Sequence, residues 1–208
     1  MTKEEWYNAL EQRHGADLQR KFSKASVAVC GLGGLGSNVA ISLARAGVGR
    51  LHLIDFDKVD ISNLHRQQYY VSQLGIYKTE AMKQTLSELA PYCDAVIDTV
   101  RLSEENLSLL SDSSIVCECF DHADCKAILV NGVSERCPEK YIVAASGMSG
   151  LHTGNTIQTK KIGKRLYICG DGASDVADDG TLFAPRVMLC AAHQANTVLR
   201  IIAEKFEV

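Results

Sequence analysis

Several signals that would assign this chain to a common class of protein are missing from its sequence. Its 208 residues contain no uninterrupted apolar stretch near the roughly 20 residues that a membrane-spanning helix requires. The formal net charge is −3, so composition gives no general attraction to nucleic acid or to an anionic membrane. There is no internal repeat and no low-complexity segment. Because 46% of the residues are hydrophobic, the expectation is one globular domain with a packed core.

A secretory signal is missing as well. The opening stretch MTKEEWYNALEQRHG is acidic and amphipathic, and it leads into no apolar run. Eight cysteines would suit a disulfide framework in a short secreted chain, but here they are spread along the chain behind no leader. We therefore expect reduced thiols and a cytoplasmic protein. Cys30 and Cys190 fall within apolar strand and helix patterns and are predicted to lie in the core.

Strands and helices alternate in the predicted structure up to residue 150. Thr2 and Glu5 have the spacing of a capping box and Gly15 offers a stop, so a helix is predicted over 3–13, with a second short helix through Leu18 and Phe22. Apolar, β-branched runs predict five strands, and amphipathic segments predict the helices between them. The strands are 26–30, 51–55, 95–100, 114–119 and 141–145, and the helices are 35–46, 78–90, 104–110 and 123–136. This alternation predicts an α/β, Rossmann-like, doubly wound fold with a mainly parallel sheet.

The pattern changes after residue 150. Residues 152–159 and 164–169 predict two strands that extend the sheet in an antiparallel manner. An acidic loop over 170–180 and a helix from Pro185 to about residue 205 follow. The domain 1–208 thus divides into a helical segment 1–24, a core 25–150, and a C-terminal part 151–208 of antiparallel strands and a helix. In SGMSG, Gly147 and Gly150 would let an extended partner peptide approach, or they simply form a turn.

Four glycines follow the strand predicted at 26–30. Gly31, Gly33 and Gly36 match G-x-G-x-x-G, and Gly34 adds a fourth glycine. Without Cβ atoms the backbone can turn tightly and bring N–H groups to phosphate oxygens, and the N-terminus of the next helix favours anions. Asp55 ends the next strand, 24 residues after Gly31, where a carboxylate can accept hydrogen bonds from ribose hydroxyls. The combination predicts a nucleotide site rather than a ligand-free turn, and it leaves both a dinucleotide and ATP open.

The segment after this acid favours a nucleoside triphosphate. Asp57 places a second carboxylate beside the first, and Asn63, Arg66 and Gln67 follow within reach of the same sheet edge. Lys78 is predicted to begin the next helix, where a cation opposes the helix dipole, so an anion is its expected partner. Each of these residues alone would more readily be a solvated surface group. Together, beside a phosphate loop, they predict neutralisation of a triphosphate.

These motifs resemble a known family. GLGGLG, then DFDKVDISNLHRQ, then Lys78 eleven residues after Gln67 are similar to the sequences of ubiquitin-activating enzymes and their bacterial relatives, the ThiF/MoeB/HesA family. Within it the chain most resembles the ThiF branch, the adenylyltransferases of thiamine biosynthesis, together with the related molybdopterin-pathway enzymes. The resemblance covers most of the chain and implies a single ThiF-type adenylyltransferase domain.

The resemblance implies chemistry on ATP with Mg²⁺. The family attacks the α-phosphate of ATP with the C-terminal carboxylate of a ubiquitin-like sulfur carrier protein ending in Gly-Gly, and an acyl-adenylate and pyrophosphate are formed. Motif position would give Asp55 the ribose, with Asp57 assisting at the nucleotide, and would place Asn63, Arg66 and Lys78 at the phosphates. The glycine loop and Gln67 would complete the nucleotide site.

Three further positions carry roles only through the resemblance. Asp121, in CECFDHADCK, would help to position Mg²⁺. Arg13, in EQRHG, would be delivered to the site from the partner subunit of a homodimer. Lys126 falls where relatives often carry arginine.

Three features depart from the family pattern. Relatives often hold a structural zinc with two Cys-x-x-Cys pairs, which this sequence lacks; Cys117 and Cys119 predict two thiols on one face of a buried strand, and no zinc is expected. His122 replaces the asparagine that follows Asp121, and it either contacts the adenylate or caps the next helix. The loop that carries a catalytic cysteine in some relatives has none here, and Cys169 just before it is predicted to be a core residue.

Three other interpretations compete. An NAD-dependent oxidoreductase would have no use for Arg13, Arg66, Lys78 and Asp121. A non-catalytic interaction module would not need the intact motifs. A related adenylating enzyme could instead act on a molybdopterin-type carrier, a modified tRNA or a small molecule, although the net charge and the lack of a basic tail argue against nucleic acid.

Overall fold

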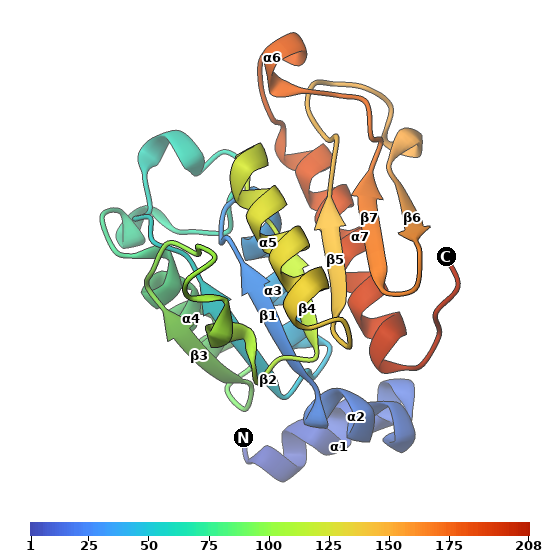
Figure 1. Ribbon diagram of the computed structural model, residues 1–208. Coiled ribbons are helices and arrows are strands. Elements are labelled where there is room, and N and C mark those ends of the chain that lie inside the picture. Colours follow the sequence, from blue (N-terminus) through green and yellow to red (C-terminus); the bar gives the residue numbers. More distant parts are fainter.

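A single seven-stranded sheet organises the chain in the computed structural model, which describes residues 1–208. The strand order is β3-β2-β1-β4-β5-β7-β6, and every neighbouring pair is parallel except β6 with β7. The predicted doubly wound α/β fold with an antiparallel C-terminal extension is therefore confirmed (Figure 1). The strands are β1 Ser26–Cys30, β2 Arg50–Ile54, β3 Asp94–Asp98, β4 Ile115–Glu118, β5 Tyr141–Ala145, β6 Gln158–Ile162 and β7 Leu166–Gly170.

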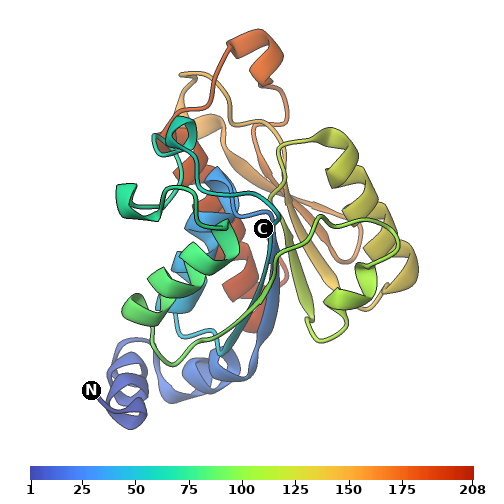
Figure 2. The same ribbon diagram turned by 90° about the vertical axis from the view of Figure 1, so that its left-hand side faces the viewer.

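Helices cover both faces of this sheet. Helices α3, α4 and α7 pack on one face and α5 lies on the other, as the two views show (Figures 1 and 2). The helices are α1 Lys3–His14, α2 Ala16–Lys24, α3 Gly34–Arg45, α4 Lys78–Leu89, α5 Ala123–Arg136, α6 Val176–Asp179 and α7 Ala184–Ile202. None of them has the length and apolar character needed to cross a bilayer.

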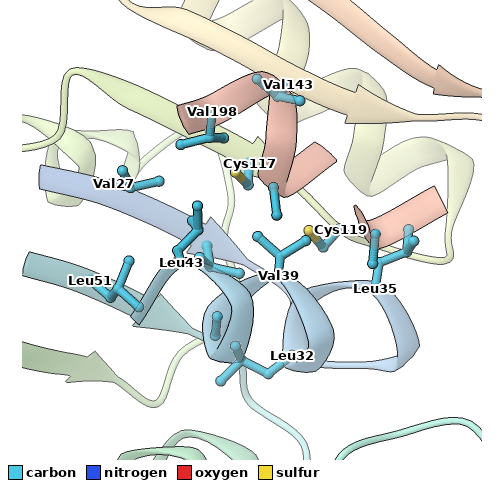
Figure 3. Packing of buried hydrophobic residues seen from close by; sticks show 14 of the residues in the cluster. Val27, Leu32, Leu35, Val39, Leu43, Leu51, Cys117, Cys119, Val143 and Val198 are labelled. Atoms are coloured by element: carbon cyan, nitrogen blue, oxygen red, sulfur yellow. The ribbon is translucent and has the colours of Figure 1, made fainter. Parts of the chain in front are cut away.

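The core lies mainly between the sheet and α3, α4 and α7. Strand β1 reads SVAVC and is buried from its second residue onward, because helices shield both faces of a doubly wound sheet. Val39 and Leu43 of α3 point toward the sheet, where Val27 and Cys117 lie (Figure 3). A smaller apolar cluster fills the space under α5 and includes Cys30. The predicted core positions of Cys30 and Cys190 are confirmed, since both side chains are fully buried.

The N-terminal helix follows its sequence signals. Thr2 accepts a hydrogen bond from Glu5 N, and the Glu5 side chain accepts one from Thr2 N, so the capping box is formed. The helix ends before Gly15, which has a φ of +90°.

Two predicted elements are wrong in position or type. The strand expected over 152–159 is β6, which begins at Gln158, and Gly154–Thr156 form a 3-10 turn instead. The reason is local, because Arg186 binds the carbonyls of His152 and Thr153, and a carbonyl held by a side chain is less available for a strand ladder. The helix expected over 104–110 is reduced to a 3-10 turn at Leu107–Leu110, and the Asn106 side chain binds the backbone just before it. The acidic loop over 170–180 contains the single turn α6.

The topology leaves a crevice at one edge of the sheet. From β1 the chain adds β2 and β3 on one side, and it then crosses to add β4 and β5 on the other. The connections therefore leave β1 and β4 in opposite directions, and such a switch point is where open α/β sheets bind ligands. The loops beyond these strands meet there, since Gly31 N–H donates to Ile54 O and Cys119 N–H donates to Cys30 O.

Candidate active site

The glycine loop between β1 and α3 is shaped by backbone packing. Gly31 has a φ of +90°, and a Cβ on it would lie 2.9 Å from the Cys119 carbonyl oxygen. A Cβ on Gly36 would lie 1.8 Å from the Gly31 carbonyl oxygen, so helix and loop approach too closely for a side chain there. Gly33 differs, because a Cβ on it would meet only Gln67 Nε2, at 3.8 Å. Space is thus left open above Gly33 at the start of α3, where a phosphate oxygen could approach the backbone N–H groups.

Asp55 ties the end of β2 to this loop. Its Oδ2 accepts a hydrogen bond from Leu32 N–H at 2.6 Å, and its Oδ1 accepts one from Asp57 N–H at 2.7 Å. The hydroxyl of Tyr69 donates to the Leu32 carbonyl at 2.7 Å, so the loop is held on two sides. Burial raises the pKa of the Asp55 carboxyl, while the nearby Lys78 ammonium and the two N–H groups oppose the rise. Since a carboxylate can accept about four hydrogen bonds, Asp55 keeps capacity for ribose hydroxyls.

Lys78 and Asp57 form an ion pair beside this carboxylate. Lys78 Nζ lies 2.8 Å from Asp57 Oδ2, and the Lys78 side chain is 7% exposed against 49% for Asp57. Lys78 N–H also donates to the Asp57 carbonyl, at 2.9 Å. The anion expected beside a lysine at a helix N-terminus is therefore Asp57 in this structure. The ammonium has two further protons with which to bind phosphate oxygens.

Asn63 organises the polar residues beside the glycine loop. Its Oδ1 accepts hydrogen bonds from Arg66 Nη2 at 3.1 Å and from Gln67 Nε2 at 3.0 Å. Arg66 Cγ lies 3.5 Å from the Cβ position of Gly34. Gln67 Oε1 is buried with no hydrogen-bond partner in the protein. The N–H groups of the glycine loop and the Arg66 guanidinium thus stand at one place, and these donors fit the phosphates of a nucleotide. The unpaired Gln67 Oε1 beside them is an acceptor and suits a hydroxyl or amino group instead.

Asp121 belongs to the same sheet edge. It lies two residues beyond Cys119, whose carbonyl contacts Gly31, and its side chain is 79% exposed. Asp121 Oδ1 lies 3.9 Å from His122 Nε2. An exposed carboxylate at this edge fits Mg²⁺, which usually takes one or two carboxylates together with phosphate oxygens. His122 occupies the N-cap position of α5 but its side chain forms no capping bond, so of the two roles expected for it the side-chain helix cap is not formed. Nowhere do three or more metal-ligating side chains cluster.

Arg13 is not brought to the site by its own chain. The Cβ position of Gly47, just before β2, is 2.9 Å from Leu10 Cδ1, so α1 packs at the N-terminal ends of the strands (Figure 1). The glycine loop lies at the C-terminal ends, about 17 Å away along a five-residue strand. Arg13 is exposed on α1.

Two residues that hold the site were missed in the sequence. Glu118 ends β4 fully buried, and both of its carboxylate oxygens lie 3.0 Å from Lys126 Nζ. Burial raises the pKa of Glu118, and the Lys126 ammonium works against that rise. Side chains alternate along a strand, so Glu118 lies on the face opposite Cys117 and Cys119, and this alternation was the one sequence signal for it. The alternation does not reveal that Lys126 of α5 is its partner. Tyr69 gives no signal that separates it from its neighbour Tyr70, which is exposed.

The segment after β5 (residues 146–150) packs against the segment after β7. A Cβ on Gly147 would lie 2.0 Å from Asp171 Oδ1, and one on Gly150 would lie 3.1 Å from the Asp179 side chain. The space beside these glycines therefore holds aspartates of the same chain, and the turn is the interpretation that the structure supports over the approach of a peptide. Cys169 is fully buried and burial raises its pKa, so the predicted core role is confirmed.

Comparison with known proteins places these residues in a family. The model of the ThiF family matches residues 7–208. The protein named adenylyltransferase and sulfurtransferase UBA4 of Candida glabrata is 33% identical over 201 residues, which cover 93% of this chain and 46% of that protein. Its namesake from Debaryomyces hansenii is 30% identical over 194 residues, covering 89% of this chain and 43% of that protein. The chain thus spans less than half the length of these two relatives.

Solved structures share the fold over nearly the whole chain. Escherichia coli tRNA N6-threonylcarbamoyladenosine dehydratase TcdA, in complex with AMP, superposes with a TM-score of 0.85 at 21% identity and covers 97% of this chain and 95% of its own. A second TcdA structure, in complex with ATP, gives a TM-score of 0.84 at 21% identity with the same coverage.

Removing the Lys78 ammonium should weaken binding of a triphosphate without unfolding the protein. For Lys78→Met we expect ATP to bind at least tenfold more weakly, because a charge-assisted contact contributes about 1.5–3 kcal/mol. The freed Asp57 is half exposed and can take up water. Isothermal titration calorimetry with ATP measures the affinity, and Lys83→Met, an exposed lysine on the same helix, is the matched control. Equal affinities for all three proteins would contradict the role of Lys78.

Proposed function

The chain belongs to the ThiF family, and from this premise we propose that it is an ATP-dependent adenylyltransferase acting on the C-terminal glycine carboxylate of a ubiquitin-like sulfur carrier protein. The carrier would end in Gly-Gly and resemble the carrier of thiamine biosynthesis, and pyrophosphate would be released. The observation that carries the proposal is the gathering of the glycine loop, Arg66 and the Asp57–Lys78 pair at one sheet edge. The name adenylyltransferase and sulfurtransferase of its relatives supports the same reaction.

The proposed roles follow from where each group stands. Asp55 ends β2 inside the loop and would accept the ribose hydroxyls. Space above Gly33 would receive phosphate oxygens. Arg66 and Lys78 would face the negative charge of the triphosphate, because these are the cationic groups next to the loop. Gln67, whose Oε1 has no protein partner, and Asn63, which orients both Arg66 and Gln67, complete the set.

The reaction needs charge neutralisation more than proton transfer. The attacking carboxylate is already ionised near neutral pH, so no general base is required. Its approach to the α-phosphate is opposed by like charge, and the guanidinium and ammonium would lower this repulsion and stabilise the leaving pyrophosphate. Mg²⁺ held near Asp121 would add positive charge at the phosphates. Fixing the two reactants close together provides much of the remaining acceleration.

A homodimer would complete the site. Arg13 lies at the wrong end of the sheet to reach the nucleotide of its own subunit, so its proposed role requires delivery from a partner subunit. It would then bind the outer phosphates. A cytoplasmic location and reduced thiols accompany this proposal.

A second candidate is adenylation of a modified tRNA. It is favoured by one observation, the superposition on TcdA over nearly the full length of both chains. At 21% identity that likeness shows a shared fold, and the formal net charge of −3 argues against a general affinity for nucleic acid.

The first test is direct detection of the product. The protein, ATP and Mg²⁺ are incubated with candidate carriers ending in Gly-Gly, and intact-mass spectrometry looks for a carrier bearing one AMP. We expect the adduct with the wild type and with Arg45→Ala, an exposed arginine on α3, and at least a hundredfold less with Arg66→Ala. A carrier without its last two glycines is the substrate control. Adenylation of threonylcarbamoylated tRNA with no carrier adduct would support the second candidate instead.

Mixing two inactive variants tests the proposed role of Arg13. Arg13→Ala and Lys78→Ala subunits should each be inactive alone. If Arg13 acts across the dimer, a mixed dimer has one complete site, and statistical exchange should restore about a quarter of the wild-type rate. Pyrophosphate exchange into ATP measures the rate, and native mass spectrometry establishes that mixed dimers have formed. Mixed dimers with no activity would show that Arg13 does not act in trans.

A further inference from the structure

The C-terminal ends of β4 and β5 separate at the edge that holds the candidate site. Backbone pairing between these strands ends at Cys117 and Val143. Beyond that point the carboxylate of Glu118 connects the two chain segments by hydrogen bonds. Its Oε1 accepts a hydrogen bond from Phe120 N–H at 2.7 Å, and its Oε2 accepts one from Ala145 N–H at 3.5 Å. A buried side chain therefore bridges the gap where the strand ladder has stopped.

Lys126 of α5 completes this bridge from one face of the sheet. Its ammonium donates to both oxygens of Glu118 at 3.0 Å and to the Ala145 carbonyl at 3.1 Å, so all three of its protons are used. Gln194 of α7 approaches from the other face. Its Nε2 donates to the Glu118 carbonyl at 2.9 Å and to the Val143 carbonyl at 3.1 Å. Side chains from two helices thus fix the two strand ends relative to each other.

Two loop segments leave from these strand ends. The chain after Phe120 reaches Asp121, the residue proposed to face Mg²⁺. The chain after Ala145 enters residues 146–150, which lie at the same edge and pack against the loop after β7. Across the gap between β4 and β5, the Glu118–Lys126 pair binds Phe120 N–H and both backbone groups of Ala145. From Ser146 onward the second segment is held by β7 and the loop after it, since Ser146 N–H donates to the Cys169 carbonyl at 2.8 Å.

We propose that Glu118 and Lys126 are positioning residues that set the carboxylate of Asp121 for Mg²⁺ and hold it at a fixed distance from segment 146–150. This inference rests on the proposed function. A buried ion pair is poor evidence for added stability, because desolvation of two charges offsets much of their attraction. Here the pair lets the strands open into a crevice while their ends stay fixed, which a continuous ladder would not allow.

The test separates positioning from simple stabilisation. Glu118→Gln keeps the shape and an acceptor but removes the charge, while Glu118→Gln with Lys126→Met leaves no buried unpaired charge. For both we expect the Mg²⁺ concentration needed for half-maximal enhancement of ATP binding to rise about tenfold, as for other groups that orient a metal ligand. ATP affinity measured in EDTA should stay at the wild-type value. Calorimetry gives both quantities and needs no carrier protein.

Two further variants sharpen the comparison. Lys126→Arg preserves the charge and should keep the Mg²⁺ midpoint near that of the wild type. Glu104→Gln, which removes an exposed partner of Arg136, should change nothing. If the variants of Glu118 melt at lower temperature with an unchanged midpoint, the pair is structural only and the inference fails while the proposed function stands. If the wild type binds ATP with no enhancement by Mg²⁺, both are overturned.

Discussion

The carboxylate of Asp55 is the contact on which the nucleotide edge depends. One oxygen accepts the N–H of Leu32 in the glycine loop and the other accepts the N–H of Asp57, so a single side chain joins the end of β2 to the loop after β1. The Asp57 that it orients in turn holds Lys78 at the start of α4. Three segments far apart in the sequence are thereby fixed at one point. Without this link the loop would keep its glycines but lose its position relative to the cation.

Charge is arranged in pairs along the same edge. Lys78 lies against Asp57 and Lys126 against Glu118, and in each pair one member is almost fully buried. The opposite charge in each pair offsets the cost of desolvating the buried group. An isolated buried group would instead shift its pKa in the direction that favours its neutral form. Arg66, in contrast, contacts the amide oxygen of Asn63 and a ring nitrogen of His65. The two cations next to the glycine loop therefore differ in their ion pairing: Lys78 is paired with the carboxylate of Asp57, whereas Arg66 is paired with no carboxylate.

Elements with strong periodicity could be predicted from the sequence, and contacts between distant side chains could not. Buried parallel strands such as β1 can be predicted because they appear in the sequence as short runs of apolar, β-branched residues. The spacing of the glycines likewise predicts the position of the phosphate loop. The strand expected over 152–159 does not form at its start because Arg186 binds the carbonyls of His152 and Thr153, which lie 34 and 33 residues earlier in the sequence. The Glu118–Lys126 pair was missed for the same reason, since each residue alone is an ordinary charged side chain.

A crystal structure with a non-hydrolysable ATP analogue and Mg²⁺ probes the central claim most directly. We expect the ribose hydroxyls at Asp55, the phosphates above Gly33, and the Arg66 and Lys78 side chains in contact with them. The α-phosphate should face the open crevice, where a peptide carboxylate could reach it. Phosphates bound far from both cations, or a dinucleotide with its nicotinamide in the crevice, would contradict it.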